Sequence, residues 1–351
     1  MEYDDFPESP FRYNLRPMAV AYKKILIIRL SSIGDVVLTT PVIRALGNCF
    51  PDAELHFLTK VAYAGLLEYH PILAKVHRFK GDLEEMISSL EAEGFDLVVD
   101  LHRNIRSALI KMRLGVKATT YSKDRLRVLL HSKWKLGKLP DVHTLDRYER
   151  ALKPIGCRLD GEGLDLYLPE ESYRTAKEIT NHYFKEPPVG VVLGGKYATK
   201  RWPSSYFVEL LNDLKLPVML LGGPEDQTAA KEVADRLHVN HLNAAGQYNL
   251  VLSAALVNQC QFVITHDTGL MHIASAFQKK IFTLWGNTVP ELGFAPYGVT
   301  NAEAIEVHDL SCRPCTKLGY DECPKGHFKC MLGLKPKVVL EQIQTWLQEF
   351  Y

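Results

Sequence analysis

The feature that most constrains the fold of this chain is a repeated unit. A short apolar run is followed by a turn of glycine or polar residues and then by a helical pattern. In the first half, the apolar runs are Lys24–Leu30, Glu54–Leu58, Val76–Phe79 and Asp96–Asp100. Runs without polar alternation are typical of strands buried on both faces, and the order strand, helix, strand predicts parallel crossovers. We therefore predict an α/β fold.

The second half repeats the unit, with strands predicted at Val189–Leu193, Val218–Leu221, Phe262–Ile264 and Ile281–Trp285. Most of these runs end in glycine or a polar turn, and ligands of open α/β sheets bind at the carboxyl ends of the strands. Both halves are therefore expected to form doubly wound, Rossmann-like domains with a cleft between them.

Composition shifts in the Gly- and Asp-rich stretch 157–169 and again at Pro187-Pro188. We place the domain boundary there. The resulting division has four parts: an N-terminal arm over 1–22, a first domain over 23–170, a second domain over 171–335, and a C-terminal helix over 336–351 that is expected to cross back to the first domain.

Length and charge exclude several classes of protein. The chain has 351 residues and a net charge of +1, which suits two cores and argues against a dedicated nucleic-acid binder. No apolar run approaches the roughly 20 residues that span a bilayer, and the acidic N-terminus does not resemble a signal peptide. We expect a cytoplasmic protein whose seven cysteines are reduced unless something binds them.

The stretch Gln261–Ala276 reads as strand, tight turn and helix. Its turn offers free backbone N–H groups at a helix N-terminus, Gly269 allows close approach, and Thr268 adds a hydroxyl. A phosphate or diphosphate is the ligand that this arrangement favours. The alternative is an ordinary connection in which Asp267 or Thr268 only caps the helix.

A basic run extends from Arg103 to Lys138, with eleven Lys and Arg residues and one acid, Asp124. A solvated surface is one interpretation. The other is a site for an anionic acceptor or an acidic membrane surface, because the run follows a strand end and also contains apolar residues.

Six separated motifs resemble glycosyltransferase family 9, the ADP-heptose:lipopolysaccharide heptosyltransferases, whose two-domain architecture is the GT-B fold. The resemblance covers Lys24 to about Leu347, and the motifs follow the family's order: KILIIRLSSIGDVVLTTPVIRAL, DLHRNIRS, GGKYATKRWP, GGPED, HDTGLMHIASA and LWGNTVPELGFAPYG.

This resemblance implies roles for individual residues. Asp35 matches the proposed general base, although an aspartate at a helix start also acts as a cap. Lys200 matches the lysine that stabilises the departing diphosphate. The resemblance and the turn chemistry together give the remaining candidates, which are Gly34, Gly195, Arg201, Glu225, Asp267, Thr268, Gly269, Leu270 and His272 for the donor, and Arg103 and Arg106 for the acceptor.

The reaction that the resemblance implies is an inverting, metal-independent transfer of a heptose or related sugar. The donor would be a nucleotide-sugar, ADP-heptose in the family, and the acceptor a lipid-linked anionic oligosaccharide of the lipopolysaccharide core. We expect a monomer that touches the inner face of the cytoplasmic membrane transiently and binds no nucleic acid. Two alternatives stay open: a nucleotide-sugar epimerase or hydrolase of the same fold, and a non-enzymatic module that binds anionic ligands.

Four cysteines near the C-terminus have partial zinc-site spacing. Cys312 and Cys315 form a Cys-x-x-Cys pair, whereas Cys323 and Cys330 are too far apart in sequence to form a second one. Zinc held by these four is one interpretation, and reduced thiols packed under a loop is the other. No other cofactor is expected.

Overall fold

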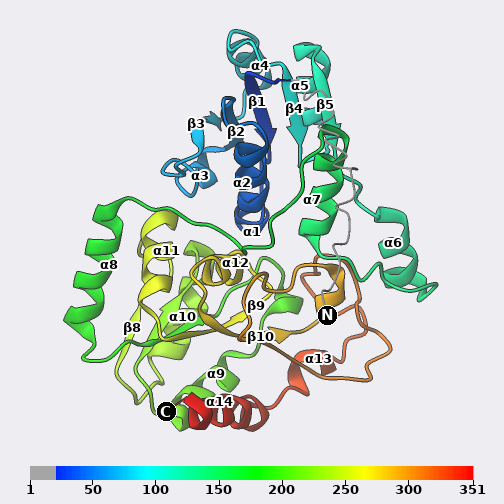
Figure 1. Ribbon diagram of the computed structural model, residues 1–351. Helices are drawn as coiled ribbons and strands as arrows, with labels where there is room; N and C mark the ends of the chain where they lie inside the picture. Colours follow the sequence, from blue (N-terminus) through cyan, green and yellow to red (C-terminus); the bar gives the residue numbers. More distant parts are fainter. Residues whose placement is uncertain (1–20, 351) are drawn as a thin grey trace, which may run out of the picture.

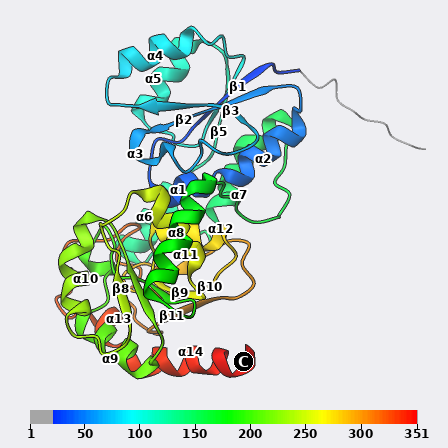
Figure 2. The same cartoon turned by 90° about the vertical axis from the view of Figure 1, so that its left-hand side faces the viewer.

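A computed structural model describes residues 21–350 of the chain, which form two stacked α/β lobes (Figures 1 and 2). The first lobe contains a five-stranded sheet in the order β3-β2-β1-β4-β5, and all of its strand pairs are parallel. Its strands are β1 (Lys24–Ile28), β2 (Glu54–Lys60), β3 (Leu73–Phe79), β4 (Leu97–Asp100) and β5 (Lys117–Thr120).

The second lobe contains a six-stranded parallel sheet in the order β11-β10-β9-β6-β7-β8. Its strands are β6 (Val189–Val192), β7 (Val218–Leu221), β8 (His241–Asn243), β9 (Phe262–His266), β10 (Lys280–Trp285) and β11 (Ala302–Glu306). Two doubly wound parallel sheets confirm the predicted α/β fold class.

Helices connect the strands of both sheets. Those up to the link between the lobes are α1 (Ile33–Val37), α2 (Thr40–Cys49), α3 (Val61–Ala64), α4 (Leu83–Glu91), α5 (Ile105–Leu114), α6 (Arg125–Trp134), α7 (Thr144–Leu152) and the short η1 (Lys153–Ile155). Those that follow are α8 (Glu170–Tyr183), η2 (Ala198–Lys200), α9 (Ser204–Leu214), η3 (Pro224–Asp226), α10 (Gln227–Ala234), α11 (Leu250–Gln259), α12 (Gly269–Ala276), η4 (Pro290–Leu292), α13 (Lys329–Leu332) and α14 (Pro336–Phe350).

The predicted apolar runs form strands, all of them central except Val76–Phe79 in the edge strand β3, and the strands missed from sequence lie at sheet edges. β5, β8 and β11 are edge strands with sequences KATT, HLN and AEAIE, and several of their side chains face solvent. An edge strand needs little apolar sequence, so its pattern is weak. Two separate helices follow β1: α1 ends at Val37, and Pro41 lies in the first turn of α2.

The two lobes meet where α1 packs against α12. Glycines make this contact possible. A Cβ on Gly34 would lie 2.3 Å from Cδ2 of His272, and one on Gly269 would lie 2.6 Å from Cβ of Ile33. The start of α1 in the first lobe therefore lies directly against the start of α12 in the second.

We expected the final helix to cross back to the first domain, but α14 packs on the second lobe. Val339 and Ile343 are buried in the core of the second lobe, and the Trp346 ring lies 5.4 Å from that of Phe262 and 6.0 Å from that of Phe282. Figure 2 shows α14 at the base of that lobe. The apolar face of α14 is buried against the second lobe and is therefore not available to pack on the first domain.

Three further expectations concern the termini and the cysteines. The arm over 1–22 lies outside the described residues, except for Ala21 and Tyr22. Cys49 and Cys157 form a disulfide with a Cα to Cα distance of 6.0 Å, which corrects the expectation that all cysteines are reduced. Cys49 is the last residue of α2, and Cys157 lies two residues after η1. Within residues 21–350, no helix is long and apolar enough to cross a membrane.

Candidate active site

Asp35 lies in the first turn of α1, directly after the carboxyl end of β1. One oxygen, Oδ2, accepts hydrogen bonds from the backbone N–H of Ser32 at 3.1 Å and from its hydroxyl at 3.0 Å, while Oδ1 lies 2.5 Å from Nη2 of Arg29. Burial alone would raise the pKa of Asp35, but the Arg29 charge and the Ser32 hydrogen bonds outweigh it and lower the pKa. The carboxylate caps α1 and also borders a cavity, so the two interpretations are compatible.

Arg29 is a buried cation that we did not select from sequence. Its Nη1 donates to the carbonyl of Leu101 and lies 3.4 Å from the Tyr121 hydroxyl. Despite its burial, Asp35, Tyr148 and Tyr121 raise its pKa, so the guanidinium stays charged. The signal was present in the sequence, since Arg29 is a cation near the end of the apolar run Lys24–Leu30.

A cavity of about 880 Å³ separates the carboxyl edge of the first sheet from the segment 311–325 of the second lobe. We call it the cationic cavity, because among the described residues that line it Asp35 is the only acid and seven are cations: Arg29, Lys123, Lys133, Lys135, Arg147, Lys317 and Lys325. A cavity with this lining favours an anionic ligand that reaches Asp35.

The second lobe contributes the turn between β9 and α12. Asp267 does not cap α12; its Oδ2 lies 2.5 Å from Nζ of Lys200 and accepts a hydrogen bond from the Thr288 hydroxyl at 3.1 Å. Thr268 occupies the N-cap position without a side-chain cap, and its hydroxyl lies 3.2 Å from that of Thr265. The first N–H groups of α12 are therefore not capped by a side chain.

A buried histidine holds the lysine loop against this turn. His266 Nδ1 donates to the carbonyl of Gly194 at 3.0 Å, and Nε2 accepts the backbone N–H of Trp202 at 3.0 Å. Burial lowers the pKa of His266 to about 4, so the ring is neutral and can serve as donor and acceptor at once. Lys200 lies between these two anchored residues. We did not select His266 as a site residue from its sequence.

Arg201 and Glu225 lie at neighbouring strand ends. Arg201 donates to the carbonyl of Gly195 at 2.8 Å, and its Nη2 lies 3.9 Å from Oδ1 of Asp226. Asp226 is buried where a Cβ on Gly194 would collide with it, and it accepts the N–H of Gly223 at 2.9 Å. Glu225 itself is exposed. Asp226 therefore holds the loops after β6 and β7 together. The sequence motif pointed to Glu225 and not to Asp226.

The remaining donor candidates lie at the contact between the lobes. Thr268 and Gly269 are partly exposed, whereas Leu270 and His272 are buried. The His272 ring packs on Gly34, and burial lowers its pKa to about 4. His272 therefore lies in the packing between α1 and α12 rather than on an open surface.

The two predicted acceptor residues lie outside the cationic cavity. Arg103 is exposed, donates to the carbonyl of Tyr121 at 3.2 Å and borders a separate pocket of about 280 Å³. Arg106 lies over the ring of Phe79, 5.9 Å from its centroid. Apart from Arg29, the cations that line the cavity with Asp35 come instead from α6 and its flanking residues, from α7, and from the segment 311–325.

The cysteine cluster gathers without closing. Burial and the neighbouring Cys312, Cys323 and Cys330 raise the pKa of the Cys315 thiol. Within residues 21–350, however, no three of these sulfurs lie within 4.8 Å of one another. Zinc at these four stays a prediction that metal analysis can test.

These contacts bring a carboxylate from the first lobe to the edge of a cationic cavity. Beside it they place an uncapped helix N-terminus and a fixed lysine from the second lobe. Such a set can remove a proton from an attacking hydroxyl and stabilise a departing phosphate.

Comparison with known proteins gives the same family. The chain is 24% identical to lipopolysaccharide heptosyltransferase 2 of Escherichia coli K12, covering 92% of this chain and 98% of that one. The fold is similar to a family 9 glycosyltransferase from Veillonella parvula (TM-score 0.78, 23% identity, 95% of this chain and 99% of that one). It is also similar to E. coli ADP-heptose lps heptosyltransferase II (TM-score 0.72, 22% identity, 93% and 100%).

The profile described as Glycosyltransferase family 9 (heptosyltransferase) matches residues 84–324, more than half of the chain. The chain is therefore a glycosyltransferase enzyme with the GT-B fold, and it belongs to glycosyltransferase family 9.

Proposed function

We propose that this protein transfers a heptose from ADP-heptose to an anionic, lipid-linked lipopolysaccharide core acceptor, with inversion at the anomeric carbon and Asp35 as the general base. The names of the E. coli relatives support the donor and the acceptor class, since one is an ADP-heptose enzyme and both act on lipopolysaccharide. An enzyme of this family transfers sugars, so the non-enzymatic alternative falls away.

The observation that carries the proposal is the contact between α1 and α12. It joins the turn that holds Asp35 to the turn that holds Asp267, Thr268 and Gly269. Acceptor and donor sites would then meet across that contact. Holding the two reactants in line would supply most of the rate acceleration.

In the proposed step, the acceptor hydroxyl attacks the anomeric carbon of the heptose as the bond from that carbon to the diphosphate oxygen breaks. The hydroxyl proton goes to the Asp35 carboxylate, which its lowered pKa keeps ionised at neutral pH. The negative charge that develops on ADP would be stabilised by Lys200, Arg201 and the first N–H groups of α12. A single displacement of this kind inverts the configuration and needs no covalent intermediate.

Asp267 supports this step indirectly. Its carboxylate and its backbone carbonyl both contact Nζ of Lys200, at 2.5 and 3.3 Å. We infer that Asp267 positions Lys200 for the diphosphate and does not itself contact phosphate, because two anions would repel each other. Among the donor candidates, Glu225, exposed after β7, would accept hydrogen bonds from the ribose hydroxyls.

The acceptor would occupy the cationic cavity. Seven cations and a single carboxylate suit an oligosaccharide that carries phosphate or carboxylate groups and presents a hydroxyl to Asp35. Lys133 and Lys135, at the end of α6, and Lys325, from the opposite segment, would hold the anionic groups from two sides.

Substituting Asp35→Asn tests the proposal. We expect kcat for heptosyl transfer to fall by about 10²- to 10⁴-fold, the range for loss of a general base, while the Kd for ADP stays within about threefold. Asp52→Asn, which changes an exposed aspartate, is the matched control. If Asp35→Asn lost ADP affinity and turnover together, Asp35 would be a binding residue. Release of free heptose without acceptor would favour a hydrolase.

A second measurement tests membrane contact at the cytoplasmic face. Beside the cavity, α6 exposes large apolar side chains among cations; Leu126, Leu129, Trp134 and Leu136 are 51–68% exposed. Such a surface suits the boundary of an anionic bilayer, where a lipid-linked acceptor resides. We expect Leu126→Glu with Trp134→Glu to weaken binding to phosphatidylglycerol vesicles at least about tenfold, whereas Tyr69→Glu, on a distant exposed turn, should not. Unchanged binding would contradict membrane docking through α6. Sedimentation of the free protein would test the predicted monomer.

A further inference from the structure

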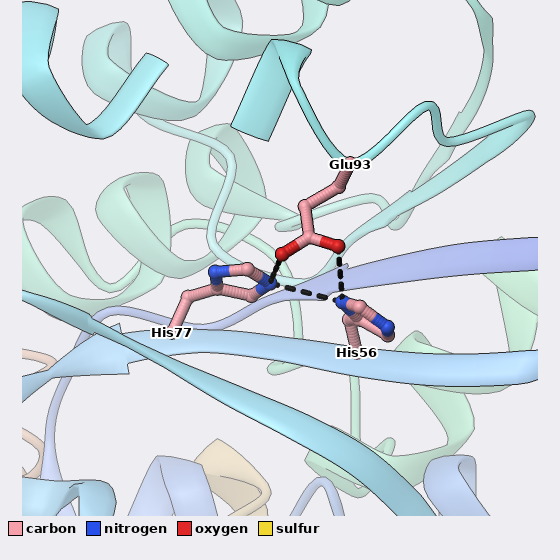
Figure 3. Close-up of side chains that lie close together, drawn as sticks. All are labelled: His56, His77 and Glu93. Carbon is pink, nitrogen blue, oxygen red and sulfur yellow. Dashed lines mark hydrogen bonds and ion pairs between the residues drawn. The ribbon is translucent and has the colours of Figure 1, made fainter. Parts of the chain in front are cut away.

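Two histidines and a glutamate gather on the first sheet, away from the proposed active site. His56 comes from β2, His77 from β3, and Glu93 from the connection between α4 and β4 (Figure 3). Within residues 21–350, these three are the one group of His, Cys, Asp or Glu residues that brings at least three ligand atoms within 4.8 Å of one another. His56 is the third residue of β2 and His77 the fifth residue of β3, and none of the three residues lines the cavity that Asp35 borders.

The donor atoms have the separations of a nearly formed metal site. His56 Nδ1 lies 3.0 Å from His77 Nε2, and the two oxygens of Glu93 lie 3.9 and 4.0 Å from these nitrogens. In a tetrahedral zinc site with bonds of 2.0–2.1 Å, neighbouring ligand atoms are about 3.3 Å apart. The carboxylate needs to move by less than 1 Å toward the rings, and Figure 3 shows its oxygens already facing them.

The surroundings orient the histidines as metal ligands are oriented in known sites. The second nitrogen of His56, Nε2, lies 3.6 Å from an oxygen of Glu54. A metal-bound histidine commonly donates its other N–H to a carboxylate, which fixes the ring and its tautomer. Both rings also pack edge-on against Phe95, with centroids 5.1 and 6.0 Å apart. A hydrogen bond joins the facing nitrogens of the two rings, His56 Nδ1 and His77 Nε2, so one of them carries a proton that leaves this position when both bind a metal.

Two lysines now balance the charge of Glu93. Its carboxylate lies 2.5 Å from Nζ of Lys75 and 3.4 Å from Nζ of Lys24. The Lys75 side chain is 54% exposed, so its ammonium can turn into water when another cation replaces it. Lys24 keeps a second partner, Glu54, at 3.1 Å. Both lysines would repel an incoming metal ion, and removing one should therefore strengthen binding.

We propose that His56, His77 and Glu93 bind a divalent transition-metal ion, best matched by Zn²⁺, which joins β2, β3 and the connection after α4. Two imidazoles and a carboxylate suit zinc better than Mg²⁺ or Ca²⁺, which prefer oxygen ligands alone. The site would be structural, because none of its three residues lines the cavity that Asp35 borders. It is independent of the proposed transfer reaction.

The test is a Zn²⁺ titration of the full chain after treatment with a chelator. A background that carries Cys312→Ser and Cys315→Ser removes the thiols most suited to compete. In this background we expect one equivalent of Zn²⁺ to bind and to raise the melting temperature. His77→Ala and Glu93→Gln should each raise the Kd for Zn²⁺ at least about tenfold, and His182→Ala, an exposed histidine on α8, should leave it unchanged.

Lys75→Gln gives a result that an ordinary packing role would not produce. We expect it to lower the Kd for Zn²⁺ severalfold, because one repelling charge is gone. The proposal is overturned if the double variant His56→Ala/His77→Ala binds Zn²⁺ as tightly as the background, or if Lys75→Gln leaves the Kd unchanged or raises it. Heptosyl transfer by the Cys312→Ser/Cys315→Ser background is measured in parallel. The result of that assay bears on the proposed function and not on the zinc site.

Discussion

Each lobe presents an aspartate at a turn between a central strand and a helix, yet the two carboxylates do different work. Asp35 lies inside the first turn of α1 and pairs with Arg29, which follows the strand that precedes the turn. Asp267 lies before the N-cap of α12 and pairs with Lys200, 67 residues away in sequence. A shift of a few positions relative to the helix start therefore separates a carboxylate that borders the cavity from one that holds a lysine.

The comparison also explains why the two turns can cooperate. In α1, Asp35 and Ser32 close a capping box, whereas in α12 no side chain caps the helix. The first turn presents negative charge and the second presents uncapped N–H groups and a cation. A base and a leaving-group site need these opposite characters. The predictions below test this division of roles, from the largest expected effect to the smallest.

Removing the cation of the second turn should have the largest effect. We expect Lys200→Met to lower kcat by about 10²- to 10³-fold, as for the loss of one preorganised group that stabilises developing charge. The control is Lys196→Met, which removes an exposed lysine four residues earlier in the same loop. Initial rates with saturating donor and acceptor would measure both. Equal rates for the two variants would show that Lys200 is only a solvated loop residue.

The contact between the turns should be nearly as sensitive. A Cβ at position 34 would lie 2.3 Å from the His272 ring, and that ring is buried between the lobes. We expect Gly34→Ala to lower the free energy of unfolding by about 1–3 kcal/mol, the usual cost of overpacking. Gly195→Ala is the control, because the nearest atom to its Cβ, on Lys200, is 3.4 Å away. Urea denaturation would measure both, and equal stability of the two variants would contradict the packing at α1 and α12.

The sequence predicted the elements that carry strong local patterns. The apolar runs gave the central strands, and the Asp35 and Asp267 turns were found from local motifs. Edge strands such as β5 lack such a pattern, because only one side of an edge strand needs a partner.

Contacts between distant segments could not be predicted. The sequence shows that Arg103 to Lys138 is basic but not which cations face a cavity. The position of α6 and the approach of the segment 311–325 determine which cations line the cavity. Lys133 and Lys325 line it, and Arg103 does not. The pairing of Lys200 with Asp267 has the same origin, since it depends on how two loops of one sheet edge meet.

His266 tests the rigid support of the second turn through pH. Its pKa in the folded protein is about 4, below the usual 6.5. Between these two pH values the unfolded chain binds a proton at this histidine and the folded protein does not. Stability is therefore fully present above pH 6.5 and is lost as pH falls toward 4. Between pH 7 and pH 5 we expect His266 to account for a loss of about 2 kcal/mol.

The His266→Asn variant should lose correspondingly less stability over this interval, although it starts lower because two buried hydrogen bonds are disturbed. His238→Asn, at an exposed histidine, should follow the unmodified protein. Chemical denaturation at both pH values would measure the difference. The same pH-dependent loss in His266→Asn as in the unmodified protein would contradict the buried, neutral ring.

The smallest effect concerns the capping box of the first turn. Asp35 has a lowered pKa, so its contribution to kcat/KM, and to stability, is present above the usual carboxyl pKa of about 3.9 and is lost only as pH falls through the lower folded value. Ser32→Ala removes the hydroxyl at 3.0 Å but keeps the backbone N–H bond. We expect the acidic limb of the kcat/KM profile to move upward by less than about one pH unit, because one of several stabilising contacts to the carboxylate is lost. Ser88→Ala, on the exposed face of α4, should leave the limb in place. A limb that does not move in Ser32→Ala would mean that Arg29 and the backbone N–H of residue 32 set the charge of Asp35 without the hydroxyl.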